Sequence, residues 1–147
     1  MRKRNVLAFS TSVLAMVAAT LLPAGPAQAI DDNCGEQNGH CIYWGQNYNG
    51  SHSNVVESVP NYPTSGSTPY TFRSSGSGQG QRIGNNNGSN RNYLQRCRIR
   101  LWYNPNYSGP NVVLAQYGDP GWQRRGSELG SLLNNIRSSD EEICYAD

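Results

Sequence analysis

The chain has 147 residues, of which 12 are basic and 10 acidic, but its first 29 residues differ in character from the rest. Residues 1–4 are positively charged, residues 6–22 are mostly apolar, and Ala27-Gln28-Ala29 has the small-x-small pattern that signal peptidases cut. We therefore expect residues 1–29 to be a signal peptide and residues 30–147 to form a single secreted, extracellular domain.

Removal of the leader changes the charge of the chain. The leader holds three of the 12 basic residues and no acidic residue, so the exported part has nine basic and ten acidic residues and a net charge of −1. This charge excludes a basic nucleic-acid binder, and no second apolar run is long enough to span a membrane. We expect neither nucleic acid nor membrane as a partner, and a monomer in solution.

Turn-forming residues dominate the exported part, in which Gly, Asn and Ser make up 45 of 118 residues. Disorder is one interpretation of such a composition. Short apolar runs bounded by Asn-Gly or Pro turns argue against it and are typical of strands; in chain order they are residues 41–44, 55–56, 99–103 and 112–115. The prediction is an all-β domain.

Residues 96–101 alternate strictly between arginine and apolar side chains. A period of two predicts a strand with Cys97, Ile99 and Leu101 facing inward and the three arginines outward. The arginines are interpreted as the solvated face of that strand, with an anion-binding patch as the alternative.

The exported part contains four cysteines, Cys34, Cys41, Cys97 and Cys144. An even number in an oxidising compartment indicates two disulfides, and three pairings are possible. Because Cys34 and Cys41 close a short loop that contains two glycines, we expect them to pair, which leaves Cys97 for Cys144.

An internal repeat is the most informative feature of the sequence. Residues 43–50, Tyr-Trp-Gly-Gln-Asn-Tyr-Asn-Gly, return 59 positions later as Trp-Tyr-Asn-Pro-Asn-Tyr-Ser-Gly at residues 102–109. Each copy predicts a strand, a folded-over hairpin and a second strand, with the leading aromatic beneath the hairpin. Each copy is followed by an Asn pair and a Ser, at residues 85–90 and 134–139.

These residues resemble the βγ-crystallin superfamily, whose Greek-key motif carries aromatic-x6-Gly on a folded hairpin and a later Ser that ties to it. The resemblance implies an eight-stranded sandwich of two motifs, about 34–92 and 96–147. Within the superfamily the chain is similar to the secreted bacterial peptidase inhibitors of the streptomycete metalloproteinase-inhibitor type, through the segment from Cys34 to Gly50 and the Phe72–Arg82 stretch that leads into Asn85.

The Asn-rich loops also resemble the calcium loop of crystallin-type domains, N/D-N/D-x-x-S/T-S. Residues 134–139 match every fixed position, whereas Asn90 replaces the final Ser of the first copy. The resemblance implies a weak calcium cofactor, because no carboxylate is present; its ligands would be Asn85, Asn86, Ser89, Asn134, Asn135 and Ser138. The alternative is that these side chains only cap their turns.

A peptidase inhibitor needs an exposed loop that enters the protease cleft. The resemblance implies a disulfide-closed reactive loop in the second half, but Cys97 and Cys144 stand 47 positions apart, so that loop has no counterpart here. The substitute is the insert at residues 60–82, where Tyr70, Thr71, Phe72 and Arg73 offer aromatic and basic side chains for a specificity pocket. An ordinary surface loop is the alternative.

The sequence offers little support for two other classes of function, an enzyme and a sugar-binding module. The two histidines, His40 and His52, lack metal-ligand spacing and no catalytic motif is present, so we expect no enzyme. A sugar-binding platform would have to use aromatics outside the hairpins, namely Tyr62, Tyr70, Tyr117 and Trp122. The sequence favours a secreted inhibitor whose partner is a secreted protease; the alternative is a calcium-binding structural or cell-wall-associated domain without inhibitory activity.

Overall fold

The computed structural model describes residues 30–35, 39–142 and 144. The predicted signal peptide, residues 1–29, lies outside the described residues. Within them are eight strands, β1 (Ile30–Asp31), β2 (His40–Tyr43), β3 (His52–Val55), β4 (Ser89–Asn92), β5 (Arg98–Asn104), β6 (Ser108–Leu114), β7 (Gln123–Arg124) and β8 (Ser138–Glu142), and two 3-10 helices, η1 (Gln46–Tyr48) and η2 (Gly126–Leu132).

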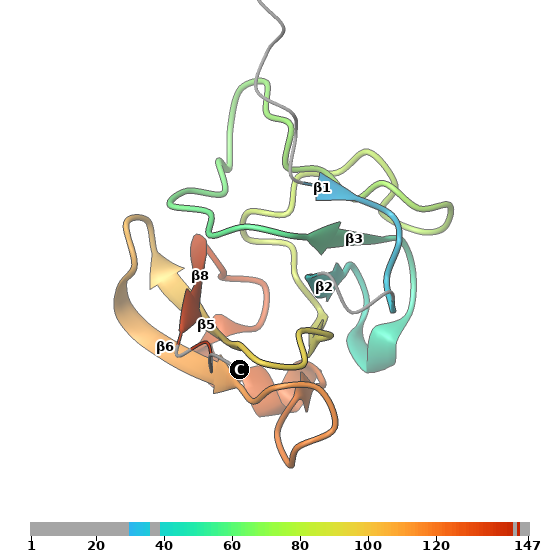
Figure 1. The fold of residues 1–147 in the computed structure, drawn as a ribbon. Helices are drawn as coiled ribbons and strands as arrows, with labels where there is room; N and C mark the ends of the chain where they lie inside the picture. The colour runs from blue at the N-terminus through green and yellow to red at the C-terminus, as the bar shows by residue number, and fades with distance from the viewer. Residues whose placement is uncertain (1–29, 36–38, 143, 145–147) are drawn as a thin grey trace, which may run out of the picture.

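The strands form two antiparallel sheets, which confirms the all-β prediction (Figure 1). One sheet has the order β1-β3-β2-β4-β7 and the other the order β6-β5-β8. Each half of the chain contributes to the sheet of the other half: β7 pairs with β4, and Val59 forms an antiparallel bridge to Ser139 in β8. This exchange is typical of a Greek-key sandwich.

The apolar runs of the sequence account for the central strands. Residues 41–43 lie in β2, Val55 ends β3, and residues 99–103 and 112–114 lie in β5 and β6. In β5 the alternation is as predicted, because Ile99 and Leu101 are buried while Arg98 and Arg100 are half-buried on the other face. The residues that connect the strands take the turns that Gly and Asn favour.

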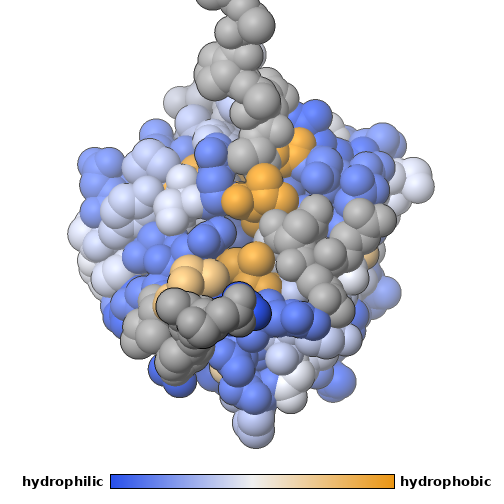
Figure 2. Space-filling view, in the orientation of Figure 1, coloured by the Kyte–Doolittle hydropathy of each residue, from blue (hydrophilic) through white to orange (hydrophobic). Residues whose placement is uncertain are grey.

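The core lies between the two sheets and is small and aliphatic, with a few aromatic rings. It consists of Ile30, Ile42, Val55, Val59, Tyr62, Phe72, Ile83, Ile99, Leu101, Leu114, Leu129, Leu132 and Ile136. In the view of Figure 2 the surface is mainly hydrophilic, with a few small apolar patches. The low apolar content of the chain therefore suffices because its apolar side chains are concentrated in one place.

The helix η2 has no counterpart among the elements predicted from the sequence. It contributes Leu129 and Leu132 to the core, and its first turn is capped by the Glu128 carboxylate, which accepts a hydrogen bond from the Arg125 N–H at 2.7 Å. The boundaries of the two motifs, about 34–92 and 96–147, stay predictions; β1 precedes the first, and residues 143 and 145–147 of the second lie outside the described residues.

Candidate functional site

The first repeat forms the folded hairpin that the sequence predicts. Asn47 and Tyr48 adopt positive φ angles of 56° and 63°, which fold η1 over the strand below. Tyr43 lies beneath it, with its ring centroid 5.6 Å from that of Tyr48 in an edge-to-face contact. The Ser89 hydroxyl ties the hairpin down, since it accepts a hydrogen bond from the Tyr48 N–H at 2.9 Å and donates to the Gly45 carbonyl at 2.7 Å.

The second repeat has the same pair of positive φ angles and the same serine tie. Asn106 and Tyr107 both have a φ of 56°. Gly109 has a φ of 82°, and a Cβ atom at this position would lie only 2.5 Å from the Asn104 side chain. The Ser138 hydroxyl accepts from the Tyr107 N–H at 3.1 Å and donates to the Asn104 carbonyl at 2.7 Å. The domain is therefore built from two copies of one tied hairpin.

The two Asn-rich loops meet directly in the middle of the fold. The Asn85 N–H donates to the Ile136 carbonyl at 3.2 Å, and the Asn134 N–H donates to the Asn87 carbonyl at 2.9 Å. The Asn87 side chain adds a bond, because its Oδ1 accepts from the Ile136 N–H at 3.1 Å. The backbone groups that face the opposite loop are thus paired with each other.

Asn86 and Asn135 cap their own turns in the same way. The side-chain amide of each donates to the backbone carbonyls two and four positions earlier, at 3.4 and 3.0 Å for Asn86 and at 2.9 and 3.1 Å for Asn135. This is the local side-chain to backbone bonding by which Asn stabilises turns.

These contacts bear on the calcium prediction. The hydroxyls of Ser89 and Ser138 are buried, and each makes one hydrogen bond as acceptor and one as donor within its hairpin. A hydroxyl oxygen has two lone pairs, so each serine keeps one acceptor position beside these bonds, and Ser89 and Ser138 stay predicted ligands. Calcium binding through the oxygens of Asn85, Asn86, Asn134 or Asn135 stays a prediction.

The structure corrects the inhibitory segment predicted at residues 70–73. Phe72 is 1% exposed and packs edge-to-face on Trp44, with centroids 5.6 Å apart. Tyr70 is half-buried and makes an edge-to-face contact with the buried Tyr62, with centroids 5.4 Å apart. Phe72 cannot enter a specificity pocket of a protease, because it belongs to the core; the segment anchors the insert, and Thr71 and Arg73 beside it are half-buried as well.

Both disulfides pair as expected. Cys34 bonds to Cys41 across a Cα–Cα distance of 5.7 Å, and Cys97 bonds to Cys144 across 4.1 Å. The first links the segment after β1 to β2, and the second links the start of β5 to the residues after β8. Covalent links thus tie the two ends of the described chain to the sheets.

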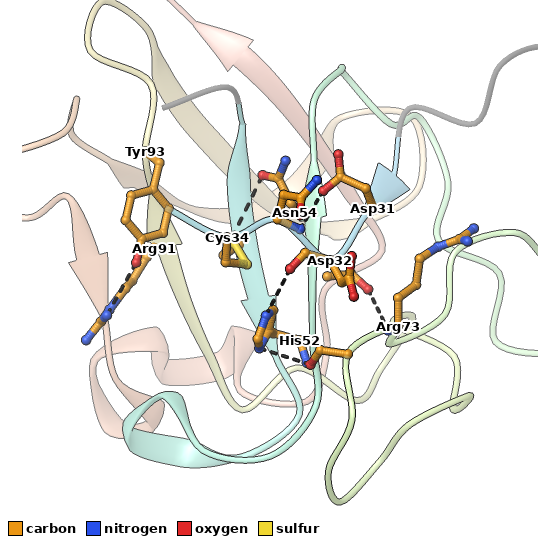
Figure 3. Close-up of a disulfide and its surroundings, with 12 residues drawn as sticks. Asp31, Asp32, Cys34, His52, Asn54, Arg73, Arg91 and Tyr93 are labelled. Carbon is orange, nitrogen blue, oxygen red and sulfur yellow. Dashed lines mark hydrogen bonds between the residues drawn. A yellow bond between two sulfur atoms is a disulfide. The ribbon is translucent and has the colours of Figure 1, made fainter. Parts of the chain in front are cut away.

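The two histidines do not form a catalytic pair. His40 is 1% exposed in β2, where burial lowers its pKa to about 4. His52 lies at the surface of β3, and its ring nitrogens contact the Asp32 carbonyl at 3.2 Å and the Ser74 hydroxyl at 3.0 Å, close to the disulfide of Cys34 (Figure 3). Among the acidic side chains, Glu142 forms an ion pair with Arg100, in which a carboxylate oxygen lies 2.6 Å from a guanidinium nitrogen.

One aromatic cluster lies at the surface near β7. Tyr117 is 41% exposed and stacks on Tyr93 at 5.7 Å, and Trp122 contacts Tyr117 at 4.9 Å. The neighbouring Arg91 lies 3.6 Å from the ring centroid of Tyr48, a cation–π contact that the sequence alone did not indicate because the partners are 43 positions apart. Of the aromatics proposed for sugar stacking, Tyr62 is excluded by its burial.

Comparison with known proteins identifies a family to which the chain is similar in sequence. The model of peptidase inhibitor family I36 matches residues 27–114, which is more than half of the chain and includes the first tied hairpin, the insert and β5. No curated protein matches the chain.

Two solved structures match the chain, and the likeness in fold rests on the first of them. One, described under the evolution of the eye lens βγ-crystallin domain fold, is 13% identical with a TM-score of 0.53, and the match covers 74% of this chain and 89% of that chain. The other, Geodin, a βγ-crystallin from Geodia cydonium, is 19% identical with a TM-score of 0.45; the match covers 72% of this chain and 50% of that one. The fold is thus the βγ-crystallin Greek key, and the chain belongs to peptidase inhibitor family I36.

Proposed function

We propose that this chain is a secreted inhibitor of a peptidase, and that its target is a secreted protease of the metalloproteinase type. The observation that carries the proposal is the match to peptidase inhibitor family I36 over residues 27–114. Both disulfides support export, because such bonds persist in oxidising compartments. In the described part of the chain, no helix has the length and apolar character needed to cross a membrane.

The geometry supports inhibition because the exposed hairpins are tied to the body of the fold. An inhibitor loses affinity when binding must order a loose segment, so a scaffold that is already ordered binds more tightly. Here each hairpin is held by a buried serine, the sheets exchange strands, and two disulfides restrain the chain.

We also propose that the protein acts by binding and not by catalysis. His40 is enclosed in β2, and both ring nitrogens of His52 contact groups of the protein itself. A general base must reach the proton that it removes, which an enclosed imidazole cannot do.

The test is a titration of the exported protein against secreted metalloproteases and serine proteases. The expected result is stoichiometric loss of activity of at least one metalloprotease. Inhibitor whose disulfides have been reduced before mixing should no longer inhibit. Undiminished turnover by every protease at about tenfold molar excess over a micromolar enzyme would contradict the proposal. Size-exclusion chromatography of the free protein checks the expected monomer.

A further inference from the structure

Residues 64–68, Thr-Ser-Gly-Ser-Thr, form a loop that projects from the body of the domain, and we call it the clamped loop (Figure 1, green). Residues 64–67 are exposed and Thr68 is half-exposed. Pro63 and Pro69 flank the loop, and the fixed φ angle of proline restricts the chain at both sides. Gly66 lies at the tip with a φ of +73° and open space around it.

A single arginine holds the tip. The Arg82 guanidinium donates two hydrogen bonds to the Gly66 carbonyl, from Nε at 2.9 Å and from Nη2 at 2.7 Å. A planar guanidinium with two donors on one acceptor fixes orientation as well as distance. Arg82 is itself held, because it bridges to Thr71 and precedes the fully buried Ile83.

The base of the clamped loop is anchored in the core on both sides. Before it, the buried Tyr62 bonds through its hydroxyl to the Ser139 hydroxyl at 2.6 Å, and its N–H donates to the Arg137 carbonyl at 2.7 Å. After it, Phe72 is buried against Trp44. The exposed tip therefore stands between two fixed ends, which is the arrangement that reduces the entropy lost on binding.

A cavity of about 330 Å³ opens beside the tip, and it is lined by Gly66, Ser67, Thr68, Thr71, Gly80, Gln81 and Arg82. The lining consists of backbone, hydroxyl, amide and guanidinium groups. A protein that docks on the clamped loop can therefore place one polar side chain in this cavity and hydrogen-bond it there.

We propose that the clamped loop is the segment that enters the peptidase cleft, and that Arg82 is the positioning residue that holds it in its binding conformation. This inference rests on the proposed inhibitor function. The side chains at the tip are small and hydroxylated, so the partner is a peptidase whose subsites accept small polar residues. The cavity takes a polar side chain from the rim of that cleft.

The test compares two matched pairs of variants against the peptidase that the wild-type protein inhibits. Arg82→Ala removes the clamp, and Arg98→Ala in β5 is its control. Gly66→Ala strains the tip at φ +73°, and Gly118→Ala is its control, because Gly118 has a φ of +88° and equally open surroundings. The inhibition constant should rise about tenfold or more for Arg82→Ala and Gly66→Ala and less than about twofold for the controls.

Two further measurements separate positioning from stability. The melting temperature of Arg82→Ala should stay within about 2 °C of wild type, since the bonds that are lost join a half-buried side chain to an exposed loop and not to the core. Amides of residues 65–67 should gain protection from hydrogen exchange only in the complex. Unchanged inhibition by Arg82→Ala and Gly66→Ala, or no protection of these amides in an inhibited complex, would overturn the inference and leave the inhibitor function standing. A wild-type protein that inhibits no peptidase would instead refute both.

Discussion

The buried histidine of β2 makes the stability of this domain sensitive to acid. His40 is 1% exposed, and its imidazole is enclosed by the strands of the sheet. Burial removes the solvation of the charged imidazolium and lowers the pKa from 6.5 to about 4, with the backbone of Val55 acting in the opposite direction. The native state therefore holds this imidazole neutral, whereas the unfolded chain takes up a proton near pH 6.5.

The sign and size of the effect follow from this difference. A group whose pKa is lower in the folded state contributes its full stability above the unfolded value, and loses it as the pH falls from 6.5 toward 4. A gap of that size corresponds to about 3 kcal/mol in total, of which about 2 kcal/mol is lost between about pH 7 and pH 5.

The assay is urea unfolding of wild type and of His40→Leu at both pH values. Leucine has a similar volume and no polar atoms, and its burial leaves no donor or acceptor unpaired, so this variant should fold at pH 7. Wild type should lose about 2 kcal/mol between the two pH values, and His40→Leu less than about 1 kcal/mol. Equal losses in both proteins would show that His40 is not the acid-sensitive group and would refute the argument.

Two further outcomes are expected from the hairpins and loops. Replacement of Ser138 by Ala should destabilise the domain by about 2 kcal/mol in urea unfolding, because the Tyr107 N–H and the Asn104 carbonyl both lose their partner. The control, Ser127→Ala, replaces an exposed serine and should have almost no effect. Similar unfolding midpoints for the two variants would refute the role of Ser138. Calcium at about 10 mM should raise the melting temperature of wild type and leave that of Asn134→Ala unchanged, because the Asn-rich loops carry the hard oxygens that calcium prefers. No rise in wild type would contradict the calcium prediction.

Much of the fold is predictable because its signals are local or repeated. The alternation of residues 98–101, the apolar run of β2 and the aromatic-x6-Gly hairpins each follow from side chains a few positions apart. Both disulfides were also predicted, because the short link between Cys34 and Cys41 is the easier one to close and leaves a single second pair.

The site was less predictable because its decisive contacts span long stretches of chain. An aromatic and basic segment such as residues 70–73 looks suitable for a protease pocket until the position of Phe72 in the core is known. The serines after the Asn pairs match the calcium motif in sequence, yet their hydroxyls are also hydrogen-bonded to hairpins that lie 41 and 31 positions earlier in the chain.

The sequence by itself determined that this is an all-β domain of two tied hairpins, because backbone turns, strand period and repeated glycines act over a few residues. Only the tertiary structure decided which side chains remain available. It placed Phe72 inside and the polar loop at residues 64–68 outside, and it brought Arg82 onto Gly66 across 16 positions. The physical reason is that burial and hydrogen bonding depend on which groups the closed sandwich brings together, and not on the residue types alone.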